Sequence, residues 1–171
     1  NYTDPVTQLP AKSMEVVIYD GMVPLLTSDE VAALIWASKP GGILMVGQSV
    51  GYVTDTNGDV HAIGFSRPVQ RLVWIEADIS VNSQTGYAGA ALLEEALVGL
   101  NASDLLLGRD VIIQRIKSVC MSFAGVFDVP AVRVGLTAAP VGTTNLVIAS
   151  RDQAVLDTAR ITIAETLSSL P

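Results

Sequence analysis

The spacing of hydrophobic residues changes along the chain, and these changes predict a mixture of strands and helices. In residues 72–81 every second residue is apolar, which is the period of a strand with one buried face. In residues 88–100 and 110–120 the apolar residues recur three or four positions apart, as on one face of an amphipathic helix. Residues 14–19 are mostly apolar and precede Asp20-Gly21, which predicts a buried strand that ends at a turn.

The first helix has both its start and its end marked in the sequence. Thr27 is followed three residues later by Glu30, the spacing of a capping box in which each side chain bonds the other residue's backbone N–H. Pro40 predicts the end, because proline disfavours helical geometry in the residue before it. The residues predicted to face the core are Val31, Leu34 and Ile35.

A β-hairpin is predicted around Asn57-Gly58, a dipeptide typical of a two-residue type I′ turn. One face of the hairpin would then be apolar, with His61 at its edge. Gly51 would lie opposite Gly64, where a bulge or a close approach of another backbone is expected. The predicted cross-strand pairs are Val50 with Phe65, Tyr52 with Ile63, and Thr54 with His61.

The second half of the chain is predicted to form two helices followed by strands. The first helix would bury a stripe of leucines, and Asp110 could cap the second. The predicted buried residues of these helices are Leu93, Leu97, Leu100, Ile113, Ile116 and Cys120. Strands are predicted at 126–129, 132–136, 146–149 and 160–164, whereas 152–159 fits either a turn or a short helix.

These elements predict an α+β protein with two small subdomains, residues 1–83 and 84–171. Each subdomain is expected to contain a mainly antiparallel sheet with one or two packed helices.

The composition limits the classes of partner. Half of the 171 residues are hydrophobic, but no window approaches the ~18–20 uninterrupted apolar residues of a membrane span, so no membrane partner is predicted. The 17 acidic and 10 basic residues give a net charge of −7, which disfavours binding to nucleic acid. The single cysteine, Cys120, excludes an intrachain disulfide and reads as core rather than nucleophile. Since the first residue is not methionine, we expect further residues upstream in a longer protein.

An apparent hydrolase signature lies in the first hairpin strand. Residues 47–51 read G-Q-S-V-G and match the nucleophile elbow, whose serine sits at a sharp turn from a strand into a helix. Ser49 and His61, the only histidine, would then make the chain a small serine hydrolase. The residues after the motif favour a strand, so the oxyanion hole has no evident source and a chance match is the preferred interpretation.

Other candidate sites have simpler structural explanations. His61 could act as a general base or pH sensor, but a partly exposed partner of Thr54 across the hairpin is favoured. Glu76 and Asp78 share one face of a strand, as paired carboxylates of glycosidases do, yet alternation alone explains them as solvated. The 55–59 loop resembles the start of a calcium loop but lacks its bidentate glutamate. No metal, cofactor or small-molecule substrate is predicted.

Arg67 lies at a corner between the hairpin and the next strand. The proline that follows it holds the arginine's backbone extended, which fixes the direction of the side chain. A guanidinium presented in this way suits a bidentate contact with a carboxylate, either within the fold or across an interface. The candidate assembly contacts are therefore Phe65, Arg67 and Pro68 at the corner, and Asn57 and Gly58 at the turn.

Together these motifs resemble the baseplate J-like family of contractile-tailed phages and related tail-like particles. The resemblance rests on their combination over nearly the whole chain. The matching pieces are Met14-Glu15-Val16-Val17, Asp20-Gly21, Thr27-Ser28-Asp29-Glu30, Lys39-Pro40-Gly41, Gly47, Asp55, Gly58, His61, Phe65-Ser66-Arg67-Pro68, Gly108-Arg109-Asp110-Val111 and Gly125-Val126-Phe127-Asp128-Val129.

The resemblance implies a structural protein of the baseplate wedge in a phage or prophage-derived particle. Such proteins associate with copies of themselves and with other wedge and hub proteins, and they build a ring around the tail hub. The particles assemble in the bacterial cytoplasm, and the ring rearranges when the tail contracts. The resemblance implies no catalysis and no cofactor. Members of the family are usually longer, with an additional N-terminal part.

Overall fold

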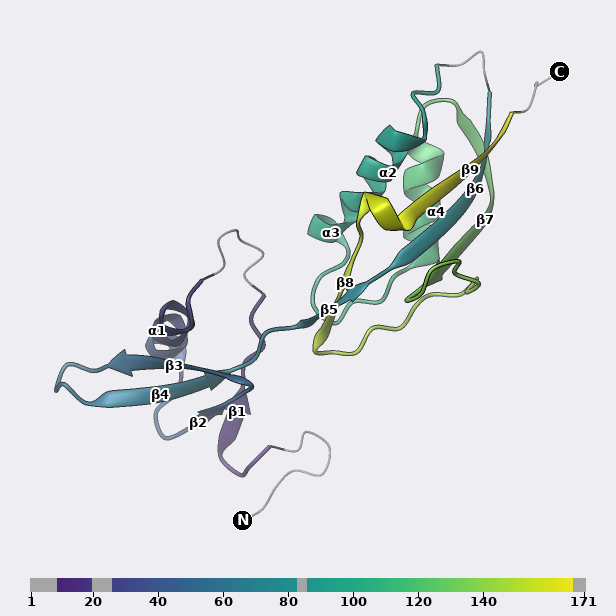
Figure 1. Ribbon diagram of the computed structural model, residues 1–171. Coiled ribbons are helices and arrows are strands. Elements are labelled where there is room, and N and C mark those ends of the chain that lie inside the picture. The colour runs from purple at the N-terminus through teal and green to yellow at the C-terminus, as the bar shows by residue number, and fades with distance from the viewer. Residues whose placement is uncertain (1–8, 20–25, 83–85, 168–171) are drawn as a thin grey trace. The chain divides into compact units, whose positions relative to one another are not determined.

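The chain divides into two compact units in the computed structural model, which describes residues 9–19, 26–82 and 86–167 (Figure 1). Unit 1 spans Asn1–Pro68 and unit 2 spans Val69–Pro171. Helices and small sheets occur in both units, which confirms the α+β class. The boundary lies earlier than the one predicted after residue 83, because residues 74–81 pair with strands that follow them in the chain.

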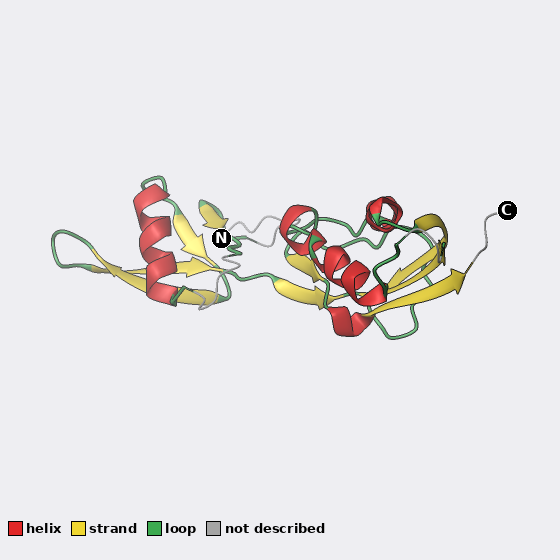
Figure 2. Ribbon diagram, turned by 90° about the horizontal axis from the view of Figure 1, so that it is seen from above, coloured by secondary structure: helices red, strands yellow, loops and turns green. Residues whose placement is uncertain are grey.

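Unit 1 contains two strand pairs and a helix. Strands β1 (Ser13–Glu15) and β2 (Leu44–Val46) run parallel and are connected through helix α1 (Ser28–Ser38). Strands β3 (Ser49–Thr54) and β4 (Val60–Phe65) form an antiparallel hairpin, and α1 lies across it (Figures 1 and 2). The buried core consists of Val31, Ala32, Ile35, Met45, Ile63 and Phe65.

Strand β1 is shorter than the strand predicted for residues 14–19. Beyond Glu15 the pairing continues only as a bridge between Val17 and Ser66. The apolar residues of this run are partly buried against the core of unit 1, whereas Tyr19 is exposed. The predicted turn at Asp20-Gly21 lies outside the described residues.

Helix α1 begins and ends where the sequence predicts. The Thr27 hydroxyl accepts a hydrogen bond from the Glu30 N–H, and the Glu30 carboxylate accepts one from the Thr27 N–H at 2.8 Å. The helix ends before Pro40, with Lys39 extended. Leu34 is 59% exposed, so its prediction as a core residue is wrong. Leu34 lies outside the buried face of α1, which is formed by Val31, Ala32 and Ile35.

The hairpin pairs one residue out of the predicted register. Ser49 lies opposite Phe65, and Val53 lies opposite His61. The cause is the turn, in which the Gly58 N–H bonds the Asp55 carbonyl and the Asp55 N–H bonds the Asp59 carbonyl. This is a three-residue loop rather than a type I′ turn, and Gly58 takes the left-handed φ of 89° that such a loop needs.

The shift reverses which side chains of β3 face the core. Val50 and Tyr52 were predicted to share the apolar face with Phe65, but they lie on the other face and are 47% and 58% exposed. Gly51 lies opposite Ile63 and not opposite Gly64. The close backbone approach predicted at Gly51 is confirmed, because α1 packs directly against it.

Unit 2 is built on a three-stranded sheet. Its central strand β6 (Trp74–Val81) runs antiparallel to β7 (Val126–Gly135) and parallel to β9 (Ile161–Leu167). Helices α2 (Ala90–Val98) and α4 (Ile113–Ser122) pack against the sheet (Figures 1 and 2). None of the helices in the described part of the chain is long and apolar enough to cross a membrane.

Short elements complete unit 2. Helix α3 (Leu100–Ser103) follows α2, and the 3-10 turn η1 (Thr158–Arg160) leads into β9. Strand β5 (Val69–Leu72) pairs in parallel with β8 (Asp152–Val155). The predicted alternation in β6 and the predicted helical stripes are confirmed, because these residues are all buried: Val73, Ile75, Ala77, Ile79, Val81, Leu93, Leu97, Leu100, Ile113, Ile116 and Cys120.

Strand β7 is one strand where two were predicted. Pro130 lies within it and is tolerated because β7 is at the edge of the sheet. The register against β6 also shifts between Asp78 and Ser80, so the ladder is already irregular there.

The predictions for residues 146–159 are wrong where the structure depends on distant partners. Residues 146–149 form no strand, and only Leu146 makes a bridge, to Val111. The ambiguous segment 152–159 begins as strand β8, which exists because β5 pairs with it.

Asp110 does not cap α4. Its carboxylate accepts a hydrogen bond from the Ile148 N–H at 2.9 Å. The N-cap position is Ile112, and the Ile113 N–H donates to the side chain of Asn145 at 3.1 Å. The acceptor comes from a loop distant in sequence, so a local pattern could not reveal it.

Candidate functional site

The serine and histidine of the hydrolase signature lie apart. Ser49 is opposite Phe65, so four residues of strand β4, about 13 Å at ~3.3 Å per residue, separate it from His61. A nucleophile and its base need to lie within ~3 Å of each other. The residues after Ser49 continue β3 and form no helix, which removes the geometry of a nucleophile elbow.

Close packing explains the glycines of the motif. A Cβ atom on Gly47 would lie 2.2 Å from the Phe65 backbone, and one on Gly51 would lie 2.0 Å from the Ser28 carbonyl oxygen. Any side chain at these positions would separate β4 or α1 from the strand. The glycines therefore serve the fold of unit 1.

His61 joins a cluster at the turn end of the hairpin. Its Nε2 lies 2.9 Å from the Asp55 carboxylate, and its ring stacks on Trp36 with centroids 4.4 Å apart. Lys39 places its ammonium 4.9 Å from the centre of the Trp36 ring. The hydrogen bond from His61, followed by those from the Asp59 and Asn57 backbone, lowers the pKa of the Asp55 carboxyl. The partner of His61 is thus Asp55 and not the predicted Thr54.

The corner at Arg67 makes contacts within unit 1. The guanidinium donates a hydrogen bond to the Leu26 carbonyl and lies 5.8 Å from the centre of the Phe65 ring. Phe65 is fully buried and belongs to the core, whereas Pro68 is half-buried. Of the predicted assembly contacts, Asn57 and Gly58 are fully on the surface, at the tip of the hairpin.

Ser66 is a structural residue that the sequence reasoning missed. It is buried, donates to the Glu15 carboxylate at 2.6 Å and accepts from the Gln48 N–H at 3.1 Å. It thereby connects β1, the segment before β3 and the end of β4. The pairing of Glu15 with Ser66 crosses 51 positions in the sequence, so no local signal could have indicated it.

The paired carboxylates Glu76 and Asp78 form ion pairs. Arg133 on the neighbouring strand donates to Asp78 at 2.8 and 3.0 Å and to Glu76 at 3.2 Å. These bonds, first those to Asp78, raise the pKa of the arginine. The sequence suggested that both carboxylates are solvated. In the structure they are instead held by the guanidinium of Arg133.

The remaining predicted candidates have structural roles. Asp55 accepts hydrogen bonds from the backbone N–H groups of Asn57 and Asp59, which builds the turn. The described residues contain no group of three or more metal-ligating side chains. Cys120 is fully buried, and burial raises the pKa of its thiol to about 11, so it stays protonated and unreactive at neutral pH.

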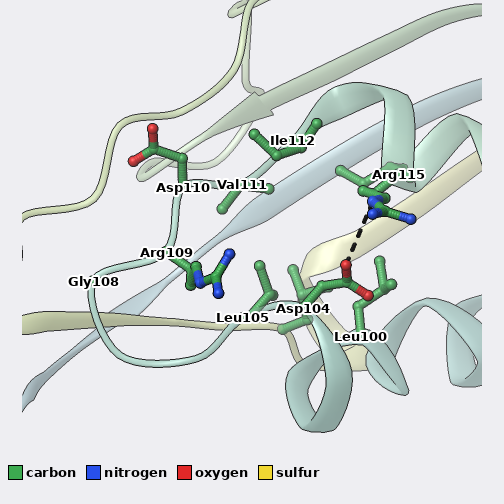
Figure 3. A pocket seen from close by; sticks show the side chains of 11 residues that line it. Leu100, Asp104, Leu105, Gly108, Arg109, Asp110, Val111, Ile112 and Arg115 are labelled. Atoms are coloured by element: carbon green, nitrogen blue, oxygen red, sulfur yellow. Dashed lines mark ion pairs between the residues drawn. The ribbon is translucent and has the colours of Figure 1, made fainter.

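Unit 2 contains a pocket that the sequence reasoning did not find (Figure 3). Its volume is about 350 Å³, and it lies between α3, the loop after it and the start of α4. Four charged residues line the pocket above an apolar floor, namely Asp104, Arg109, Asp110 and Arg115. Only the ion pair of Arg115 with Asp104, at 3.5 Å, joins two of these four.

The hairpin of unit 1 presents apolar side chains to solvent. We call this surface the hairpin outer face and define it by Val50, Tyr52, Val60 and Ala62. The three larger residues are 47%, 58% and 66% exposed, in that order. Cross-strand pairing joins Tyr52 directly to Ala62, so the face is continuous.

No model of a known protein family matches the chain. No curated protein sequence matches it either.

Proposed function

We propose that this chain is a structural component of a contractile-tail baseplate wedge, which acts through protein–protein interfaces and carries out no catalysis. The observation that carries the proposal is the run of motifs from Met14 to Val129 that resembles the baseplate J-like family. Its partners would be further copies of the chain and other wedge and hub proteins, and its location would be the tail baseplate of a virion or related particle.

The structure supports an architectural role for the motif residues. Thr27 and Glu30 fix the start of α1, Gly58 makes the hairpin turn, and Ser66 connects three segments of unit 1. The hairpin outer face adds a surface suited to a partner, since exposed apolar patches mark interaction sites.

Mass spectrometry of purified contractile tail particles, from the organism that encodes the chain, tests the proposal. We expect the chain in intact baseplates at a fixed ratio to other wedge proteins. Its absence from intact baseplates would contradict the proposal.

A surface variant tests the role of the hairpin outer face. The triple variant Val50→Thr, Tyr52→Thr and Val60→Thr removes apolar area but keeps residues that favour strands. We expect its incorporation into particles to fall. The matched control is Val141→Thr with Val147→Thr, which changes valines of unit 2 that are 87% and 78% exposed. Equal incorporation of both variants would show that this face is not the interface.

The competing interpretation, a serine hydrolase using Ser49 and His61, has a direct test. We expect a fluorophosphonate probe to leave the protein unlabelled, because Ser49 has no base within reach. Stoichiometric labelling that disappears in the Ser49→Ala variant would reverse the proposal.

A further inference from the structure

The pocket of unit 2 has the features of a ligand site. Its volume of about 350 Å³ falls in the range of small-molecule sites, roughly 300–1,000 Å³. Leu105, Val111, Ile116 and Leu156 form its floor, and each is at most 3% exposed. This floor is built on a fixed frame, because Val111 bridges to Leu146 and the Leu105 carbonyl accepts a hydrogen bond from the buried Gln153.

The acids and the arginines at the rim differ in their partners. Asp110 accepts the Ile148 N–H, and Asp104 accepts the Ser103 hydroxyl and forms an ion pair with Arg115, so each acid has a partner within the fold. The Arg109 side chain is exposed and makes no hydrogen bond or ion pair within residues 9–19, 26–82 and 86–167. Figure 3 shows the Arg109 guanidinium beside Leu105 at the pocket, with the Asp110 carboxylate pointing away from it.

We propose that this pocket binds a carboxylate that is carried next to an aliphatic group. The carboxylate would accept two parallel hydrogen bonds from the Arg109 guanidinium, with Arg115 as a second donor. The aliphatic group would lie on the apolar floor of the pocket. A singly charged anion suits the site better than a phosphate, because the two arginines are offset by two aspartates and the whole chain carries −7. This proposal stands independently of the proposed function.

Two sources could supply this chemistry, a free short-chain carboxylic acid or an acidic residue beside a leucine in a peptide. The test is an NMR titration of the backbone amides of the full chain with two probes, sodium hexanoate and N-acetyl-Leu-Glu-Leu-amide. We expect saturable shifts confined to residues 100–116 and to the segment around Leu156 with at least one probe. Saturation by hexanoate alone identifies a free acid as the source, and saturation by the peptide alone identifies a protein segment.

Charge and shape are separated by matched controls. Hexanamide has the same aliphatic chain without the charge, and we expect it to bind at least about fivefold more weakly, which corresponds to ~1 kcal/mol. Arg109→Gln should weaken the binding of hexanoate by a similar factor. Lys117→Gln removes one positive charge from a residue of α4 that does not line the pocket, and it should leave the affinity for hexanoate unchanged. Arg109 is exposed, so its variant should keep the wild-type amide spectrum elsewhere.

Three results would overturn the proposal. They are the absence of saturable shifts with both probes, equal binding of hexanoate and hexanamide, and equal binding by the wild type and Arg109→Gln.

Discussion

Gly51 shows how the absence of one side chain sets the packing of unit 1. A methyl group there would lie 2.0 Å from the Ser28 oxygen and 2.8 Å from the Ala32 side chain, so α1 would have to move away from β3. We expect Gly51→Ala to lower the free energy of unfolding of unit 1 by about 3 kcal/mol, the upper range for overpacking. Urea unfolding, followed by Trp36 fluorescence in a Trp74→Phe background, measures this change.

Gly41 provides the matched control. It has nothing within 4 Å of the position that a Cβ atom would take, and its φ is not positive. Gly41→Ala should therefore leave the stability within about 0.5 kcal/mol of the wild type or raise it slightly. If the two alanine variants unfold at the same urea concentration, the close packing at Gly51 is not what limits the fold.

Asp55 and His61 give a prediction for pH dependence. The pKa of Asp55 is lowered in the folded state, so its contribution to stability is present above the ordinary aspartate pKa of about 3.9 and is lost as the pH falls through the lower, folded-state pKa. We expect His61→Phe to raise the Asp55 pKa, because Phe can keep the stack on Trp36 but cannot form the hydrogen bond. A carbon-13 NMR titration of the Asp55 carboxyl measures it. An Asp55 pKa equal in both proteins would mean that His61 is not its main stabilising partner.

At the scale of elements, local signals were sufficient where a local contact decides the structure. The start of α1 depends on two residues three positions apart, and the alternation of β6 depends on its own sequence, so both could be predicted. The hairpin register could not be predicted in this way. The Asp55 side chain accepts hydrogen bonds from the Asn57 and Asp59 backbone, which favours a loop one residue longer than the predicted type I′ turn. The cap of α4 and the existence of β8 depend on Asn145 and β5, which are far away in sequence.

The candidate sites also divide into features that local sequence can predict and features that depend on distant segments. Sequence reasoning preferred a chance match for the hydrolase motif, and the β-forming residues that it noted after Ser49 do form strand β3. It missed the pocket of unit 2, since α3, α4 and the segment before η1 come together only in the folded chain. The charge of Arg109 is visible in the sequence, but the aliphatic floor beside it is not.

The capping box of α1 carries an element-scale prediction. Thr27→Ala removes the acceptor for the Glu30 N–H and one anchor of the Glu30 carboxylate. We expect the free energy of unfolding of unit 1 to fall by about 1 kcal/mol, the usual cost of losing an N-cap. Ser28→Ala is the control, because the Ser28 hydroxyl makes no side-chain hydrogen bond within the described ranges. A loss of stability as large in Ser28→Ala would show that the cap is not the cause.

At the scale of the whole molecule, the two units have separate cores of different size. Among the described residues, six buried hydrophobic residues form the core of unit 1 and twenty-one form that of unit 2. Buried apolar area is the main favourable term in folding, and a unit as small as Asn1–Pro68 buries a smaller fraction of its surface. Unit 1 should therefore be the less stable of the two.

The two tryptophans allow this difference to be measured, because Trp36 belongs to unit 1 and Trp74 to unit 2. We expect Trp74→Phe, which retains Trp36, to show a fluorescence transition at lower urea concentration than Trp36→Phe, which retains Trp74. Gly51→Ala should then move the Trp36 transition and leave the Trp74 transition unchanged, since its clash lies within unit 1. A single common midpoint that shifts for both tryptophans would instead mean that the units unfold as one cooperative body.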